Sequence, residues 1–197
     1  MQPTTSEEIE ADSMDIEAIV AEVQAGDKQA YQAILTHFER KMYTYCYYIL
    51  KNHADTEDAV QEIFIRAFEH LHQYNRQASF SAWLYKVAYH HLINMKKKKS
   101  RWLRVIERCK EQQPAPEISR HETVVSELLT YLTPEERHIL LLKAVEQYTF
   151  EEISEIMGLK SDTIRKKYQR LRAKLMEHVC HKGERAHGTY AASNGIR

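Results

Sequence analysis

Glycine and proline are scarce in this 197-residue sequence, with five and four residues respectively. Few stretches are rich in Val and Thr and bounded by turns, so the strands of a sandwich or barrel are not expected. No run of eighteen apolar residues occurs, and the acidic N-terminus lacks the basic and apolar segments of a signal peptide. These absences predict an all-α, soluble, cytoplasmic protein with no direct membrane insertion.

Cysteines and catalytic motifs are sparse as well. The three cysteines, Cys46, Cys109 and Cys180, are odd in number and far apart, which favours reduced thiols over a disulfide framework. Nothing resembles a nucleophile with its base, a glycine-rich phosphate loop or a paired-carboxylate site. We therefore expect a chain that is not an enzyme and has no cofactor.

Eleven histidines raise the alternative of a metal-dependent enzyme. A cluster near the C-terminus contains His178, Cys180, His181 and His187. Its spacing fits no standard zinc pattern, and a histidine-bearing flexible tail is the simpler explanation. We expect no bound metal, while the metal enzyme stays open as an alternative.

The formal net charge of zero hides a strong segregation of sign along the chain. Residues 1–22 hold seven acids and no Lys or Arg, and residues 112–158 hold nine acids against three bases. Residues 96–111 and 159–182 each hold eight bases against two acids. Blocks of one sign create local fields, so two separate basic segments are available for an anionic partner.

The periodicity of apolar residues predicts two small helical domains joined by a flexible linker. An acidic, disordered tail (1–14) precedes a four-helix domain (15–99), and the linker (100–120) contains Gln-Gln-Pro-Ala-Pro. A short helix over 101–110 of this linker is an alternative. Expected helix starts and stops in the first domain are Gly26, Asp27, Asp55 and Ser79. The apolar face expected for its third helix comprises Val60, Ile63, Phe64, Ala67, Phe68 and Leu71.

The second domain (121–180) contains two expected capping boxes, Thr133 with Glu136 and Thr149 with Glu152. The second of these predicts a short helix over 150–157 that stops at Gly158, and Ser161 is expected to cap a long helix after it. A disordered tail (181–197) is expected to follow. A short helix, a glycine turn and a basic helix form the pattern of a helix-turn-helix.

The basic helix after Gly158 has two distinct faces. Its expected core stripe is Ile164, Tyr168, Leu171 and Leu175, and the opposite face carries Asp162, Lys166, Gln169 and Arg170 with Arg165 at its edge. Arg and Gln side chains suit guanine and adenine edges in the major groove, and Lys suits phosphate. This face predicts duplex DNA binding, although a solvated basic face has the same composition.

In the first domain a mixture of basic and aromatic residues precedes Lys96. It includes Trp83, Tyr85, Tyr89, His90 and His91. Aromatic faces stack on unpaired bases while lysines follow phosphates, so single-strand binding is one interpretation. Ordinary helix packing is the other, and Trp83 is assigned to the core.

Two stretches and the helix-turn-helix together resemble a known family. Residues 55–68 (DTEDAVQEIFIRAF) and 80–88 (FSAWLYKVA) look like sigma region 2, and the helix-turn-helix looks like sigma region 4. The resemblance covers about residues 25–99 and 122–178, without an intervening region 3. That layout is similar to the extracytoplasmic-function (ECF) group of RNA polymerase sigma factors. It implies an alternative sigma factor that binds core RNA polymerase and promoter DNA and is held inactive by an anti-sigma factor.

The resemblance also implies roles for individual residues. Those expected to bind polymerase are Asp58, Gln61 and Glu62. Those expected at the minus-10 element, around a loop over 72–79 that captures a flipped base, are Asn75, Ser79, Lys86, Tyr89, His90 and Lys97. Those expected at the minus-35 element are Thr163, Arg165, Lys166, Gln169 and Arg170.

The chain departs from the family pattern at three places. His90 and Asn94 stand where the family often has Asn and Asp, and Asp162 stands where a Gly often begins the recognition helix. These departures bear on which promoter sequence is read. A stand-alone helix-turn-helix transcription regulator remains the alternative function, because it needs the basic helix but not the acidic surface at Asp58.

Overall fold

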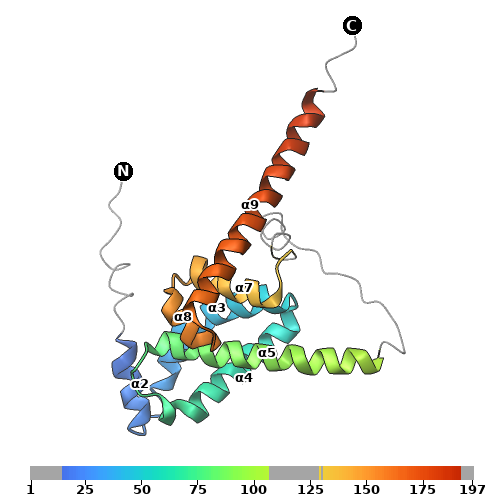
Figure 1. Cartoon of the computed structure of the whole chain (residues 1–197). Coiled ribbons are helices and arrows are strands. Elements are labelled where there is room, and N and C mark those ends of the chain that lie inside the picture. The colour runs from blue at the N-terminus through green and yellow to red at the C-terminus, as the bar shows by residue number, and fades with distance from the viewer. Residues whose placement is uncertain (1–14, 107–128, 130, 192–197) are drawn as a thin grey trace, which may run out of the picture. The chain divides into compact units, whose positions relative to one another are not determined.

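The computed structural model describes residues 15–106, 129 and 131–191. Within these ranges the chain consists of helices and turns without a strand, which confirms the all-α prediction. It divides into two compact units, residues 1–99 and 100–197, and each is described by itself (Figure 1). The acidic tail expected over 1–14 lies outside the described residues, as does the expected linker beyond Ile106.

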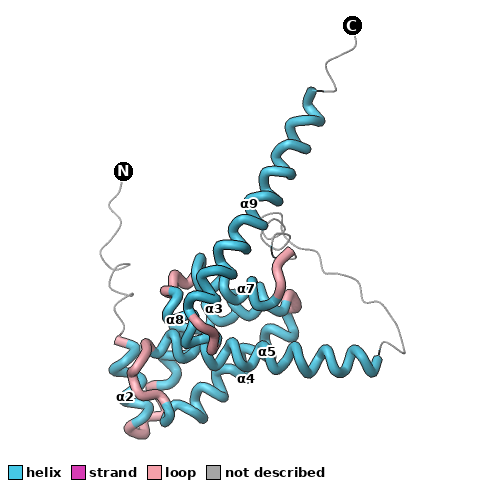
Figure 2. The backbone as a smooth tube through the Cα atoms, in the orientation of Figure 1, coloured by secondary structure: helices cyan, strands magenta, loops and turns pink. Residues whose placement is uncertain are grey.

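The described part of the first unit contains four α-helices and a short 3₁₀ turn. Figure 2 shows its helices in cyan and the connecting loops in pink. The elements are α2 (Ile16–Gln24), α3 (Tyr31–Leu50), α4 (His53–His70), η1 (Leu71–Gln73) and α5 (Phe80–Ile106). Helix α3 packs against α2 and α4. Fully buried side chains from all four helices form the core, among them Val20, Ile34, Ile63, Leu84 and Leu92. Burying apolar surface of this kind is the main favourable contribution to folding.

The starts of α3 and α4 differ from the sequence prediction. Asn52, not Asp55, caps α4, because its side-chain oxygen accepts a hydrogen bond from the Asp55 backbone N–H at 2.8 Å. Lys51 ends α3 in a left-handed conformation, which brings Asn52 into the capping position. Asp27 does accept hydrogen bonds from Gln29 and Ala30, but in a turn that precedes the start of α3 at Tyr31.

The fourth helix of this unit is longer than predicted. Ser79 caps α5 as expected, since its hydroxyl accepts a hydrogen bond from the Ala82 backbone N–H at 3.2 Å. The helix then continues beyond Lys99 to Ile106, so residues 100–106 of the expected linker are helical. Adding a residue to an existing helix gains a hydrogen bond without a new nucleus, which favours this extension.

The second unit contains a helix-turn-helix. Its described elements are α7 (Pro134–Leu140), the π turn η2 (Leu141–Val145), α8 (Phe150–Met157) and α9 (Ser161–Ala191). Both predicted capping boxes are confirmed, Thr133 with Glu136 and Thr149 with Glu152. Buried side chains from all four elements form its core, among them Ile139, Leu142, Ile153, Ile164 and Leu171.

Helix α9 differs from the prediction at both ends. It begins at Ser161 itself, because the Lys160 carbonyl accepts from the backbone N–H groups of Thr163 and Ile164. It continues to Ala191, which corrects the disordered tail expected over 181–197 for residues 181–191. These residues lack proline, and the two glycines among them, Gly183 and Gly188, weaken a helix that has already formed without breaking it.

None of the helices within the described ranges is both long enough and apolar enough to cross a membrane. The described residues also contain no group of three potential metal ligands. Cys46 is a buried free thiol in α3, and burial raises its pKa to about 12.

Candidate nucleic-acid interface

The turn between α8 and α9 fixes how the basic helix is presented. Gly158 has a φ of 67°, the left-handed conformation that favours glycine, and it closes the C-terminus of α8. The small Ser154 side chain donates a hydrogen bond to the Leu159 carbonyl, and the Leu159 N–H returns one to the Ser154 carbonyl at 3.2 Å. These contacts hold the turn between the two helices in a single conformation.

Helix α9 buries one face and exposes the other, as predicted. Ile164 and Leu171 are buried, Tyr168 and Leu175 are half-buried, and the Tyr168 ring lies 5.6 Å from that of Phe150. All five predicted minus-35 residues are exposed: Thr163, Arg165, Lys166, Gln169 and Arg170. At 3.6 residues per turn, all of these except Arg165 project within about 60° of Lys166.

Arg165 differs from its neighbours because it already has partners. Its guanidinium lies 3.3 Å from Glu151 and 3.5 Å from Asp162, and 5.4 Å from the centre of the Phe150 ring. Among the residues that the structure describes, the side chains of Lys166, Gln169 and Arg170 have no hydrogen-bond or ion-pair partner. The outward face therefore carries two cations and an amide that can turn to a ligand, and Arg165, which is held by acids, lies at its edge.

A second exposed stripe runs along α5 in the first unit. Lys86, His90 and Lys97 are exposed and Tyr89 is half-buried, and all four project within about 60° of Lys86. Asn75 and Ser79 are exposed in the loop that leads into this helix. The six predicted minus-10 residues thus come from one helix face and the loop before it.

The aromatic residues of this region are divided between core and surface. Tyr85 is buried, whereas Trp83 is half-buried, with its ring 5.7 Å from Tyr74 and 5.6 Å from Phe80. The prediction of Trp83 as a core residue is therefore only partly right. Burial and, to a lesser extent, the charge of Lys86 lower the pKa of His90, which favours its neutral imidazole.

Helix α4 carries the residues predicted to bind polymerase. Asp58 and Gln61 are exposed, while Glu62 is half-buried and forms an ion pair with Arg66 at 2.7 Å. The prediction placed Phe68 on the buried face, yet Phe68 is 37% exposed, two residues before the end of α4 at His70. Ile65 is 52% exposed, and both project within about 60° of Gln61.

Phe68 and Ile65 border a groove of about 790 Å³ between α3 and α4. Its lining includes Tyr31, Leu35, Val60 and Phe64, and the Tyr31 hydroxyl donates to the Phe64 carbonyl at 2.8 Å beneath it. The exposed acids Glu39 and Glu69 also line it. Sequence analysis missed this groove, although Ile65, an apolar residue off the buried stripe, was a visible signal.

His91 is expected to make the stability of the first unit depend on pH. Its Nε2 atom is buried and has no hydrogen-bond partner among the described residues. Burial first, and then the charge of Arg66, lower its pKa, against a smaller opposing effect of Glu62. Because the unfolded chain binds this proton more tightly than the folded one, the free energy of unfolding should fall as the pH drops below the ordinary histidine pKa of about 6.5.

We expect His91→Leu to reduce this loss of stability. The measurement is the urea midpoint at pH 7.5 and pH 5.5, compared with the wild type. Asn94→Leu, on an exposed position of the same helix, controls for the added apolar side chain. The same pH dependence in wild type and His91→Leu would contradict this account.

Comparison with known proteins identifies both units. The family model for sigma-70 region 2 matches residues 34–113, and that for sigma-70 region 4 matches residues 123–175. The ECF RNA polymerase sigma factor SigW of Bacillus subtilis is 27% identical over 182 residues, which cover 84% of this chain and 97% of that protein.

Two solved structures share the fold. CnrH, in complex with the cytosolic domain of CnrY, has a TM-score of 0.65 and 19% identity, with 83% of this chain and 96% of that chain covered. RpoE of Bartonella quintana, in complex with the anti-sigma factor NepR, has a TM-score of 0.66 and 17% identity, with 75% and 94% covered. With both sigma-70 regions present in order, this chain belongs to the ECF group of RNA polymerase sigma factors.

Proposed function

We propose that this chain is an alternative sigma factor that binds core RNA polymerase and directs it to specific promoters. The observation that carries the proposal is the combination of two surfaces in one chain. The outward face of α9 offers cationic and amide side chains to duplex DNA, and α4 offers an apolar groove with acidic residues around it. A protein that only binds DNA needs the first surface and not the second.

The polymerase-binding surface in this proposal is the α4 surface, defined by Asp58, Gln61, Glu62, Ile65 and Phe68. Exposed apolar side chains next to a groove are typical anchors of protein interfaces. The acids around them favour a partner surface that is basic and carries apolar residues of its own. Asp58, Gln61 and Glu62 come from the family resemblance, while Ile65 and Phe68 are added by their exposure.

DNA binding in this proposal is divided between the two units. Five residues of α9 read the minus-35 element in the duplex: Lys166, Gln169 and Arg170, with Thr163 and Arg165. The stripe on α5 and its loop hold the opened minus-10 element: Asn75, Ser79, Lys86, Tyr89, His90 and Lys97. Exposed lysines can follow the phosphates there, while Tyr89 and His90 can stack on unpaired bases.

The domain boundaries of the proposal are 15–99 for the polymerase and minus-10 functions and 121–180 for the minus-35 function. Residues 100–120 connect them. The chain acts by positioning polymerase and trapping melted DNA, without catalysis of its own, and does so in the cytoplasm, where core polymerase works. We also propose an anti-sigma factor as a partner, since RpoE was solved with one.

The proposal is tested by mixing the purified chain with bacterial core polymerase and separating the complex by gel filtration. We expect the chain to elute with the core enzyme. The resulting holoenzyme should then select one promoter class from a library of DNA fragments. A chain that binds DNA fragments but never elutes with core polymerase would favour the stand-alone regulator.

A further inference from the structure

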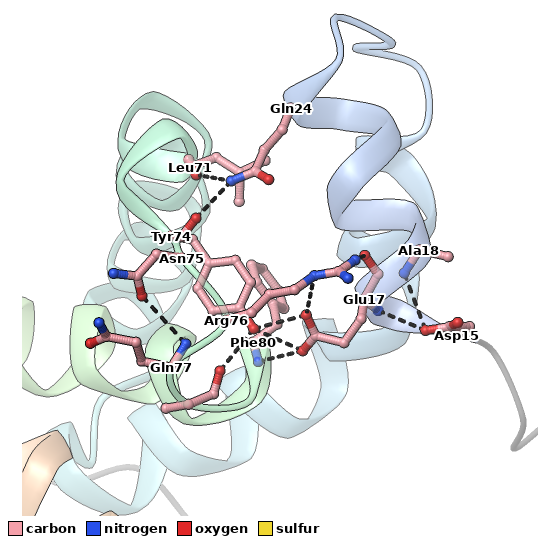
Figure 3. Close-up of polar contacts among 11 residues, drawn as sticks. Asp15, Glu17, Ala18, Gln24, Leu71, Tyr74, Asn75, Arg76, Gln77 and Phe80 are labelled. Atoms are coloured by element: carbon pink, nitrogen blue, oxygen red, sulfur yellow. Dashed lines mark hydrogen bonds and ion pairs between the residues drawn. The ribbon is translucent and has the colours of Figure 1, made fainter.

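Glu17, near the start of α2, connects this helix to the loop that precedes α5. Its carboxylate accepts hydrogen bonds from the Tyr74 hydroxyl, at 2.9 and 2.8 Å from its two oxygens, and from the Phe80 backbone N–H at 2.8 Å (Figure 3). Arg76 reaches the same residue, with Nε 3.6 Å from Oε2 and Nη2 donating to the Glu17 carbonyl. One acidic residue thus contacts the loop at two positions and the first residue of α5.

Gln24, at the other end of α2, holds the beginning of the same loop. Its side-chain amide donates to the carbonyls of Leu71 at 2.8 Å and Tyr74 at 2.9 Å (Figure 3). The Tyr74 hydroxyl also lies 2.8 Å from the Ala78 carbonyl. Polar contacts with α2 therefore hold the loop at Tyr74 and Arg76, and they hold the first residue of α5, Phe80.

The loop needs such contacts because its backbone is not held by regular structure. Arg76 has a φ of 57°, a left-handed conformation that costs free energy for a residue with a side chain. The Phe80 N–H lies in the first turn of α5 and has no carbonyl partner within that helix. Glu17 supplies an acceptor for this N–H from 63 residues away, and its negative charge suits the positive end of the helix dipole.

The contacts leave the remaining loop side chains facing outward. Tyr74 is buried against Phe80, with ring centres 5.6 Å apart, whereas Asn75, Gln77 and Ser79 are exposed. Burial, together with Glu17, raises the pKa of Tyr74, so its hydroxyl stays protonated and remains a donor. Anchoring the buried ring orders the exposed residues that flank it.

We propose that Glu17 is a positioning residue for promoter recognition, which fixes the 74–79 loop and the start of α5 so that they can receive unpaired minus-10 bases. The inference rests on the proposed function, because it concerns the same DNA surface. Glu17 itself does not contact DNA. It orders the loop before DNA binds, so the cost of ordering the loop does not reduce the free energy of binding.

The test uses holoenzyme made from the full chain and core polymerase. Its probe is a promoter that the wild-type holoenzyme selects, opened in advance by mismatches over the minus-10 element. The quantity measured is the ratio of the affinities for this DNA and for the same DNA with a scrambled minus-10 strand. We expect Glu17→Ala to lower the ratio by about tenfold, the order expected when charge-assisted hydrogen bonds that order a loop are lost.

A ratio of affinities distinguishes a positioning effect from a general loss of folded protein. A smaller active fraction reduces the measured binding to both DNAs by the same factor, so it leaves the ratio unchanged. Glu17→Gln keeps one carbonyl acceptor and should recover part of the ratio, which provides a second variant if Glu17→Ala unfolds. Glu22→Ala, which removes an exposed acid from the same helix, should leave the ratio unchanged. Elution with core polymerase and binding to the duplex minus-35 element should be normal in all three variants.

An unchanged ratio in both Glu17 variants would overturn the inference while leaving the proposed function intact. Failure of the proposed function has a different signature. The wild-type chain would then not elute with core polymerase or would not distinguish the two DNAs, and the inference would fall with it.

Discussion

Arg170→Ala should weaken binding to the duplex minus-35 element by about 1–3 kcal/mol, the range of a good side-chain contact to a base edge. Lys166→Ala should weaken binding to all sequences and reduce the slope of log affinity against log salt by about one, as expected for a lost phosphate contact. The measurement is fluorescence anisotropy of a labelled promoter fragment over a range of salt concentrations. Elution with core polymerase should stay as in the wild type.

Lys174 provides the matched control for these two substitutions. It is a cation on the same helix, but its ammonium group lies 3.5 Å from Glu136 of α7 and off the outward face. Lys174→Ala should therefore change the affinity for DNA much less. If Arg170→Ala abolished polymerase association together with DNA binding, the outward face of α9 would be wrongly assigned.

Arg165→Ala should have a smaller effect than Arg170→Ala. To reach a base, the Arg165 side chain must leave or share its ion pairs with Glu151 and Asp162. The free energy lost from these ion pairs offsets part of the free energy gained from the contact with the base. Exposed ion pairs of this kind contribute little to stability, so the variant should remain folded.

The double substitution Ile65→Ser with Phe68→Ser should weaken association with core polymerase by at least about 2 kcal/mol, the size of effect seen at interface hot spots. The reason is that both side chains expose apolar surface beside the α3/α4 groove. Equilibrium titration of the labelled chain with core polymerase measures the effect. Binding of the isolated chain to duplex minus-35 DNA should be unchanged.

Two controls make this result specific. Met176→Ser removes another exposed apolar side chain, 63% exposed on α9, and should leave polymerase affinity unchanged. Ile65→Ser alone guards against unfolding, because Phe68 also contacts the ring of Tyr31 at 4.9 Å. Wild-type affinity in the double variant would exclude the groove from the polymerase interface.

Sequence reasoning predicted the features that depend on a few neighbouring residues. The capping boxes at Thr133 and Thr149 and the turn at Gly158 are set by residues within one helical turn, so their patterns are readable. The buried face of α9 follows from helical spacing alone. These local rules were sufficient to predict the helix-turn-helix and its outward residues.

Two kinds of feature could not be predicted in this way: the choice between two possible capping residues, and contacts between residues that are far apart in the sequence. Asn52 and Asp55 are both good caps, and the left-handed Lys51 decides between them. The exposure of Phe68 depends on where its face lies relative to α3. Glu17 meets Tyr74 and Phe80 across 57 and 63 residues, a contact for which the sequence contains no local signal.

Run-off transcription with purified core polymerase tests the central claim most directly. The template is a promoter recovered from the library by gel-filtered holoenzyme, and the reactions contain core polymerase alone or core polymerase with the chain. We predict a discrete transcript from a fixed start site only when the chain is present, and its loss with the Ile65→Ser and Phe68→Ser double variant. A chain that gives no specific transcript from any recovered promoter would contradict its assignment as a sigma factor.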